Sequence, residues 1–80
     1  MLYKLARYDK TKKVELDSCV VGRTDLLDML NVILGHSPKH RIQVKNEISD
    51  LKSKEDAIWF GVGGTLDRTY IFQYKITIDE

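Results

Sequence analysis

The chain has 80 residues, 42% hydrophobic and 31% charged, which is the composition of a globular domain rather than of a disordered segment. Thirteen Lys and Arg residues against twelve Asp and Glu give a formal net charge of +1, whereas a dedicated nucleic-acid-binding domain is usually more basic. The apolar runs fall far short of the roughly 20 residues that span a bilayer. We therefore expect a single domain over residues 1–80 and no contact with a membrane.

The cysteine content and the chain length indicate the cellular compartment and the kind of activity to expect. The single cysteine, Cys19, has no partner in the chain for a disulfide, and the N-terminal residues lack the apolar stretch of a signal peptide. Both observations favour a reducing, cytoplasmic setting. A chain of this size has little room for a deep pocket, so we expect a binding role, with no enzymatic activity and no cofactor.

The N-terminal part of the chain predicts two strands joined by a short turn. Apolar residues lie on both faces of residues 2–8, which is typical of a strand in the middle of a sheet. Residues 9–13 are polar and begin with an aspartate, as hairpin turns often do. Residues 14–21 alternate between apolar and polar, and Ser18 interrupts the apolar row. The second strand is therefore expected to be half exposed and bent.

A single helix is predicted over residues 25–34. Thr24 is a suitable N-cap, and the first turn carries acidic residues, which the helix dipole favours. Leucine and isoleucine residues recur at the i, i+3, i+4, i+7 spacing of one helical face. Gly35 stands where a C′ glycine is common, and Pro38 prevents continuation of the helix.

Three further strands are predicted in the second half of the chain. Residues 41–45 and 58–62 alternate, and from 70 to 78 every second residue is large and apolar. Residues 46–56 leave two alternatives open, a short helical turn or a strand extension followed by a loop.

The predicted fold class is α+β. One helix packs on one face of a four- to five-stranded sheet, in the order ββαβββ. This order fits a β-grasp arrangement, in which the first and last strands lie side by side in the centre of the sheet.

The last two strands, taken together, predict an uncovered apolar patch. Pairing Phe60 with Phe72 puts both on the core face and leaves Trp59 on the opposite face, which a single helix cannot cover. Tryptophan is strongly enriched at binding hot spots. Two other interpretations place Trp59 beneath residues 46–56 or against the side chain of Lys75. The residues predicted to bind a partner are Trp59, Ile71, Gln73 and Lys75.

Two groups of basic residues indicate an alternative function. One lies in the first turn and the other at the start of the predicted third strand. Either group could contact phosphates or an acidic partner, although lysines in turns also commonly serve solubility and edge protection. The residues predicted for nucleic-acid binding are Lys10, Lys12, Lys13, Lys39, His40 and Arg41.

Other chemistry-bearing patterns fit ordinary structure better than a site. The glycines at 61–64 lack the following helix that phosphate-binding loops require. His36 and His40 have the spacing of a helical metal pair, but Pro38 between them makes that helix unfavourable, and we expect no metal site. Cys19 lies on a predicted strand, without a feature that would lower its pKa and make it a nucleophile.

The sequence thus predicts a small protein-interaction domain, an inhibitor, adaptor or regulator that binds a protein through the open sheet face or an edge strand. Homodimerisation through the same surfaces is equally compatible. Size alone suggests a phage or mobile-element origin. The alternatives are a nucleic-acid-binding protein and a minimal RNA-cleaving enzyme of the toxin type.

Overall fold

The computed structural model describes residues 1–9, 13–63 and 70–79, and only the backbone at positions 62, 63, 70 and 71. Within these residues no helix is long and apolar enough to cross a membrane. The described elements are β1 (Leu2–Asp9), β2 (Val14–Gly22), α1 (Arg23–Ile33), α2 (Pro38–Asp50), β3 (Ile58–Gly63) and β4 (Tyr70–Ile78).

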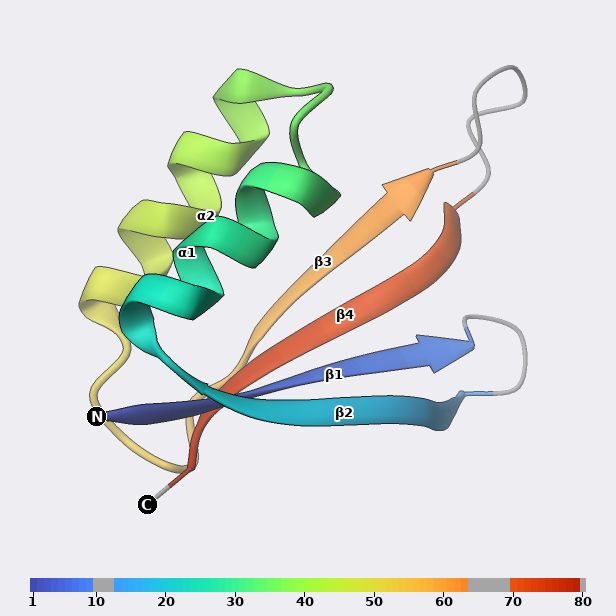
Figure 1. Cartoon of the computed structure of the whole chain (residues 1–80). Helices are drawn as coiled ribbons and strands as arrows, with labels where there is room; N and C mark the ends of the chain where they lie inside the picture. The colour runs from blue at the N-terminus through green and yellow to red at the C-terminus, as the bar shows by residue number, and fades with distance from the viewer. Residues whose placement is uncertain (10–12, 64–69, 80) are drawn as a thin grey trace.

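The described strands form one antiparallel sheet in the order β2-β1-β4-β3 (Figure 1). The first and last strands are therefore the central pair, as the two-faced pattern of residues 2–8 predicted. Leu5 lies opposite Ile76 across this pair, and the Asp79 N–H donates to the Leu2 carbonyl 2.9 Å away. The two ends of the described chain consequently meet at one end of the sheet.

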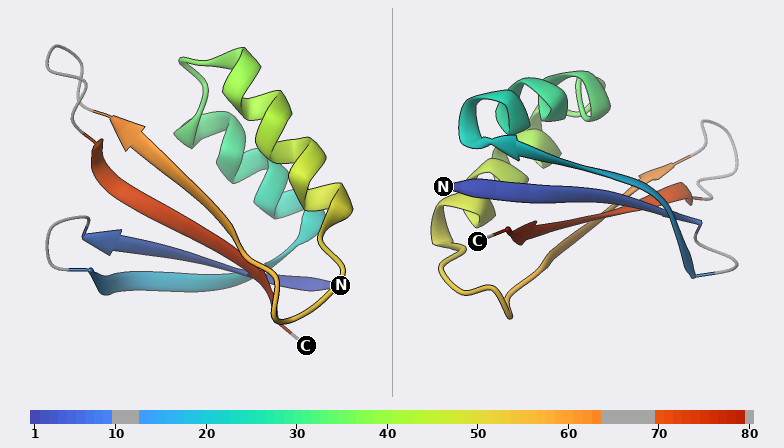
Figure 2. Two further views of the ribbon diagram at one scale, coloured as in Figure 1. Left: turned by 180° about the vertical axis from the view of Figure 1, so that it is seen from behind. Right: turned by 60° about the horizontal axis from the view of Figure 1, so that its bottom comes forward.

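Both described helices pack against the same face of the sheet, and neither covers the opposite face (Figures 1 and 2). We call the helix-free side the open face. The core between helices and sheet is apolar because each strand turns alternate side chains toward the helices. Its buried members are Tyr3, Leu5, Leu26, Leu30, Leu34, Val44, Ile48, Leu51, Ile58, Phe60, Ile76 and Ile78.

The prediction of a strand at residues 41–45 is wrong, because they lie within α2. The described order is ββααββ, with two helices instead of one, so the predicted order ββαβββ is wrong, although the first and last strands do lie side by side in the centre of the sheet. Pro38 does not block this helix, because it stands in its first turn, where the missing N–H costs no hydrogen bond. Ile42 and Val44 stand two positions apart and so imitate one face of a strand. In the helix they lie on different sides, because Val44 is buried and Ile42 faces solvent.

The undecided segment, residues 46–56, is divided between two structures. Its first part completes α2, which ends at Asp50, and Ile48 faces the core together with Leu51 just beyond the helix. The remaining residues connect α2 to β3 without a further helix or strand. Neither proposed alternative described the segment fully.

The bounds of α1 also differ from the prediction. The helix begins at Arg23, with Gly22 rather than Thr24 as N-cap and without a side-chain capping hydrogen bond. Gly35 follows its end, but no described glycine has a positive φ, so the expected C′ geometry is absent there. Glycine is favoured at position 35 for a steric reason instead: a Cβ there would lie only 2.6 Å from the Asn31 carbonyl oxygen.

The register of the final hairpin differs from the prediction by two residues. Phe60 lies opposite Tyr74 rather than Phe72, and the two rings stack with centroids 5.2 Å apart. Because side chains alternate with a period of two, this shift of two leaves Trp59 and Phe60 on their predicted faces. Trp59 consequently lies on the open face, opposite Lys75.

Candidate functional site

The open face is built from alternate residues of the described strands. The β3–β4 register places Trp59 beside Lys75 and Gly61 beside Gln73. The β1–β4 register adds Tyr8 on the other side of Gln73. Side chains from three strands therefore surround Gly61 and Gln73, and the glycine contributes no side chain to cover them.

Trp59 is the largest apolar side chain on this face, and 47% of its surface is exposed. The Tyr8 ring lies against it, with centroids 5.3 Å apart and planes inclined by 54°. The Lys75 Nζ lies 5.1 Å from the centre of the indole ring, within the range of a cation–π contact. The Lys75 interpretation is thus correct in its geometry, but this contact leaves nearly half of the indole available to a partner.

A shallow hollow of about 320 Å³ adjoins the aromatic pair, lined by Tyr8, Lys13, Trp59 and Gln73. Lys13 reaches this position because its backbone is left-handed, with φ of 55°, and its N–H donates to the Asp9 carbonyl at 2.8 Å. The tight end of the first turn therefore brings a cation to the edge of the aromatic surface. We call Tyr8, Lys13, Trp59, Gln73 and Lys75 the aromatic patch.

The sequence alone did not assign Tyr8 or Lys13 to this patch. The period-2 pattern showed that Tyr8 shares a face with Ala6, but only the strand order reveals that this face is the open one and that Trp59 is near. Ile71 belongs to β4, and its predicted role lies outside the described side chains. Lys10 and Lys12 lie outside the described residues altogether.

The second predicted basic group lies in the other layer of the molecule. Lys39, His40 and Arg41 form the first turn of α2, and the His40 ring meets the core residue Phe60 edge-on with centroids 6.2 Å apart. Arg41 lines a groove between the two helices. The structure therefore does not combine this group with Lys13 on a single surface.

Charges on the open face are mixed and partly paired. Lys4 and Glu15 form an ion pair at 3.2 Å, and the aromatic patch adds two lysines. The edge strand β2 exposes apolar residues as well, with Val14, Leu16 and Val20 each about half exposed. A register irregularity opposite Arg7 and Tyr8 interrupts its pairing with β1, a feature that disfavours continuous pairing with another strand.

Among the described residues, no three His, Cys, Asp or Glu side chains lie close enough together to hold a metal ion. No family model, no curated protein and no solved structure matches this chain.

Proposed function

We propose that the chain is a small non-enzymatic interaction domain that binds a protein partner through the aromatic patch. The observation that carries this proposal is the half-exposed indole of Trp59 on a sheet face without a covering helix. A partner would bury the Trp59 and Tyr8 rings, which is the anatomy of a hot spot: aromatic anchors surrounded by a polar rim. Such a domain would act as an inhibitor, adaptor or regulator by occupying a surface of its partner.

The surroundings of Trp59 support a protein rather than a small molecule as the partner. The volume of the adjoining hollow, about 320 Å³, is at the lower limit for small-molecule pockets, and only four described residues line it. The patch also presents hydrogen-bonding groups of two kinds, the Gln73 amide and the lysine ammonium groups. These groups can satisfy a polar rim without a deep cavity.

Replacing Trp59 by Ser tests the proposal. The variant should keep its fold, with a free energy of unfolding within about 1 kcal/mol of the original, because the side chain is half exposed. Its affinity for a partner should fall at least thirtyfold, roughly the loss of 2 kcal/mol that defines a hot spot. Affinity capture with the original chain and with Trp59→Ser identifies the partner. Titration of the captured partner against each of the two chains then measures the difference in affinity.

Val32→Ser provides the matched control, because Val32 is an exposed apolar residue on α1 in the helical layer. This variant should bind like the original chain. Unfolding of Trp59→Ser would show that the indole is a core element, and unchanged binding by that variant would exclude the patch as the interface.

The chain has one tryptophan, so its fluorescence reports directly on burial of Trp59. A concentration-dependent blue shift of the isolated protein would identify a second copy as the partner.

One observation favours nucleic-acid binding as a second candidate: Lys13 and Lys75 flank the Tyr8–Trp59 pair. Aromatic rings on a sheet with adjacent cations can stack unpaired bases and contact their phosphates. Titration of a single-stranded oligonucleotide would then quench Trp59 fluorescence, and binding would weaken steeply with salt. Lys13→Gln should reduce this binding, whereas Lys39→Gln in the helical layer should not. Absence of quenching at low salt would exclude this candidate.

A further inference from the structure

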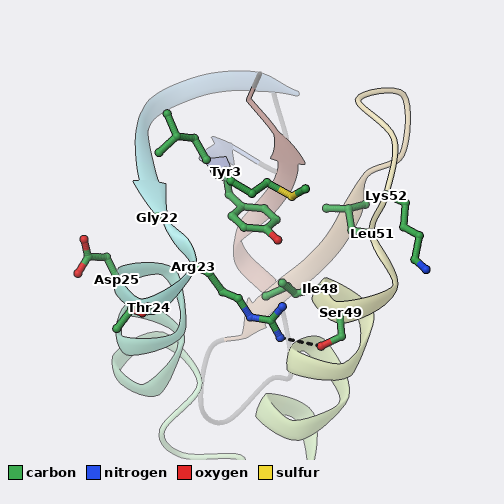
Figure 3. A pocket seen from close by; sticks show the side chains of 11 residues that line it. Tyr3, Gly22, Arg23, Thr24, Asp25, Ile48, Ser49, Leu51 and Lys52 are labelled. Atoms are coloured by element: carbon green, nitrogen blue, oxygen red, sulfur yellow. Dashed lines mark hydrogen bonds between the residues drawn. The ribbon is translucent and has the colours of Figure 1, made fainter.

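A second hollow lies at the other end of the molecule from the aromatic patch. It has a volume of about 710 Å³, opens widely to solvent and is lined by the start of α1, the end of α2 and the start of β1 (Figure 3). Leu2, Ile48 and Leu51 contribute apolar surface to its wall. The hollow shares no lining residue with the aromatic patch, so it is a separate candidate site.

Polar side chains from three elements meet in this hollow: Arg23 of α1, Ser49 of α2 and Tyr3 of β1 (Figure 3). Arg23 Nη2 donates to the Ser49 hydroxyl at 2.8 Å, which joins the start of α1 to the end of α2. The Ser49 hydroxyl also lies 3.4 Å from the Lys45 carbonyl, to which it donates. The guanidinium is thus held across the hollow by one of its donors, and its other donors make no hydrogen bond to another described residue, so a ligand could use them.

Tyr3 gives an independent indication of a ligand. The residue is only 3% exposed, yet its hydroxyl points into the hollow and makes no hydrogen bond to another described residue. No described side-chain oxygen or nitrogen is both buried and without a hydrogen-bond partner, so the Tyr3 hydroxyl is open to the hollow, where a bound molecule can reach it. The Tyr3 hydroxyl is therefore a preplaced donor that the described part of the protein does not use.

The backbone adds further donors at the same place. Helix α1 begins at Arg23 without a side-chain cap, so the first N–H groups of its 11 residues are available and carry the positive end of the helix dipole. The end of α2 contributes a negative partial charge nearby, and Arg23 reaches this helix end through its hydrogen bond to Ser49. Asp25 is the acidic residue among those lining the hollow, and its carboxylate points away from the centre.

We propose that this hollow binds the phosphoryl group of a small phosphomonoester. A tetrahedral dianion can accept from the Arg23 guanidinium, the Tyr3 hydroxyl and the first N–H groups of α1 at once. The apolar wall of Leu2, Ile48 and Leu51 would contact the organic part of the ligand. This binding is separate from the proposed function of the aromatic patch and does not depend on it.

Titration of the intact chain with inorganic phosphate and with phenyl phosphate, at constant ionic strength, tests this site. Saturable shifts of the backbone amide signals of residues 23–25 and 49 are expected in nuclear magnetic resonance spectra. Arg23→Gln should weaken binding at least about tenfold, because it removes a charged donor. Tyr3→Phe should weaken binding severalfold, since it removes only the hydroxyl and keeps the ring in the core.

Arg41→Gln is the matched control, because it removes the same charge from the groove between the helices and should leave phosphate binding unchanged. Trp59→Ser should also bind phosphate normally, which separates this site from the aromatic patch. Absence of saturable shifts, or equal phosphate affinity of Arg23→Gln and the original chain, would overturn the proposal. Acetate binding as tight as phosphate would overturn the phosphoryl assignment. Should Tyr3→Phe fail to fold, the phosphate affinity of Arg23→Gln still tests the proposal, because Arg23 is exposed.

Discussion

At the scale of single residues, burial separates two apolar side chains of α1 that stand two positions apart. Leu30 is 1% exposed, whereas Val32 is 84% exposed. Leu30→Ala should lower the free energy of unfolding by about 2–5 kcal/mol, because it leaves a cavity between helix and sheet. Val32→Ala should change it by less than about 0.5 kcal/mol. Urea unfolding followed by circular dichroism measures both, and equal effects would contradict the assigned faces of the helix.

Two glycines make a second contrast at the same scale. A Cβ at Gly35 would lie 2.6 Å from the Asn31 carbonyl oxygen, whereas a Cβ at Gly22 would meet nothing within 4 Å. Gly35→Ala should therefore destabilise the protein by about 1–3 kcal/mol, as overpacking does. Gly22→Ala should stay within about 1 kcal/mol of the original. Thermal unfolding of the two variants tests the difference, and a fully stable Gly35→Ala would show that the helix end relaxes freely.

At the scale of elements, α2 is the helix with weak local signals. Its first turn carries no acidic residue and its last turn no basic one. Lys39 and Arg41 instead place positive charge beside the positive end of the dipole, which is unfavourable. The helix is retained because Val44 and Ile48 bury their side chains in the core, so packing rather than propensity holds it.

This charge placement predicts that Lys39→Glu stabilises the protein. The gain in the free energy of unfolding should be about 0.5–1 kcal/mol at low salt. Lys39→Gln should give roughly half of that gain, because it removes the unfavourable charge without adding a favourable one. High salt should reduce both gains. A Lys39→Glu variant no more stable than Lys39→Gln would exclude the dipole as the cause.

The same helix shows why part of the fold could not be predicted from the sequence. The strands around Tyr3, Phe60 and Ile76 were predictable, since a period of two is explicit in their residues. In α2 only Val44 and Ile48 mark a helical face, and the exposed Ile42 completes a false strand pattern. Pro38 compounded the error, because a proline ends one helix and begins the next equally well.

The candidate site divides in the same way. Trp59 could be assigned to the uncovered face, because an error of two residues in the register leaves every side chain on the same side. Tyr8 and Lys13 could not be assigned, because they approach Trp59 only once β1 lies beside β4. The hollow at Tyr3 and Arg23 also depends on the second helix, which the sequence did not reveal.

At the scale of the whole molecule, the sheet consists of two hairpin pairs, β1–β2 and β3–β4, joined along the antiparallel β1–β4 contact. Leu5 and Ile76 meet across this contact, although they are 71 positions apart in the sequence. Loop closure over such a distance is slow. We therefore expect both pairs to form before the central contact closes over the core.

This central contact determines how the molecule responds to mechanical tension. The start of β1 and the end of β4 lie together, where the Asp79 N–H donates to the Leu2 carbonyl. Handles attached at residues 2 and 79 would load the ladder one hydrogen bond at a time, as in opening a zipper, and rupture should need little force. Handles at residues 2 and 73 would load the ladder along its length, because Gln73 pairs with Tyr8 at the far end. Optical tweezers with cysteine handles on a Cys19→Ser background should record a higher rupture force for the second pair, which makes this small sheet weak in one direction and strong in another.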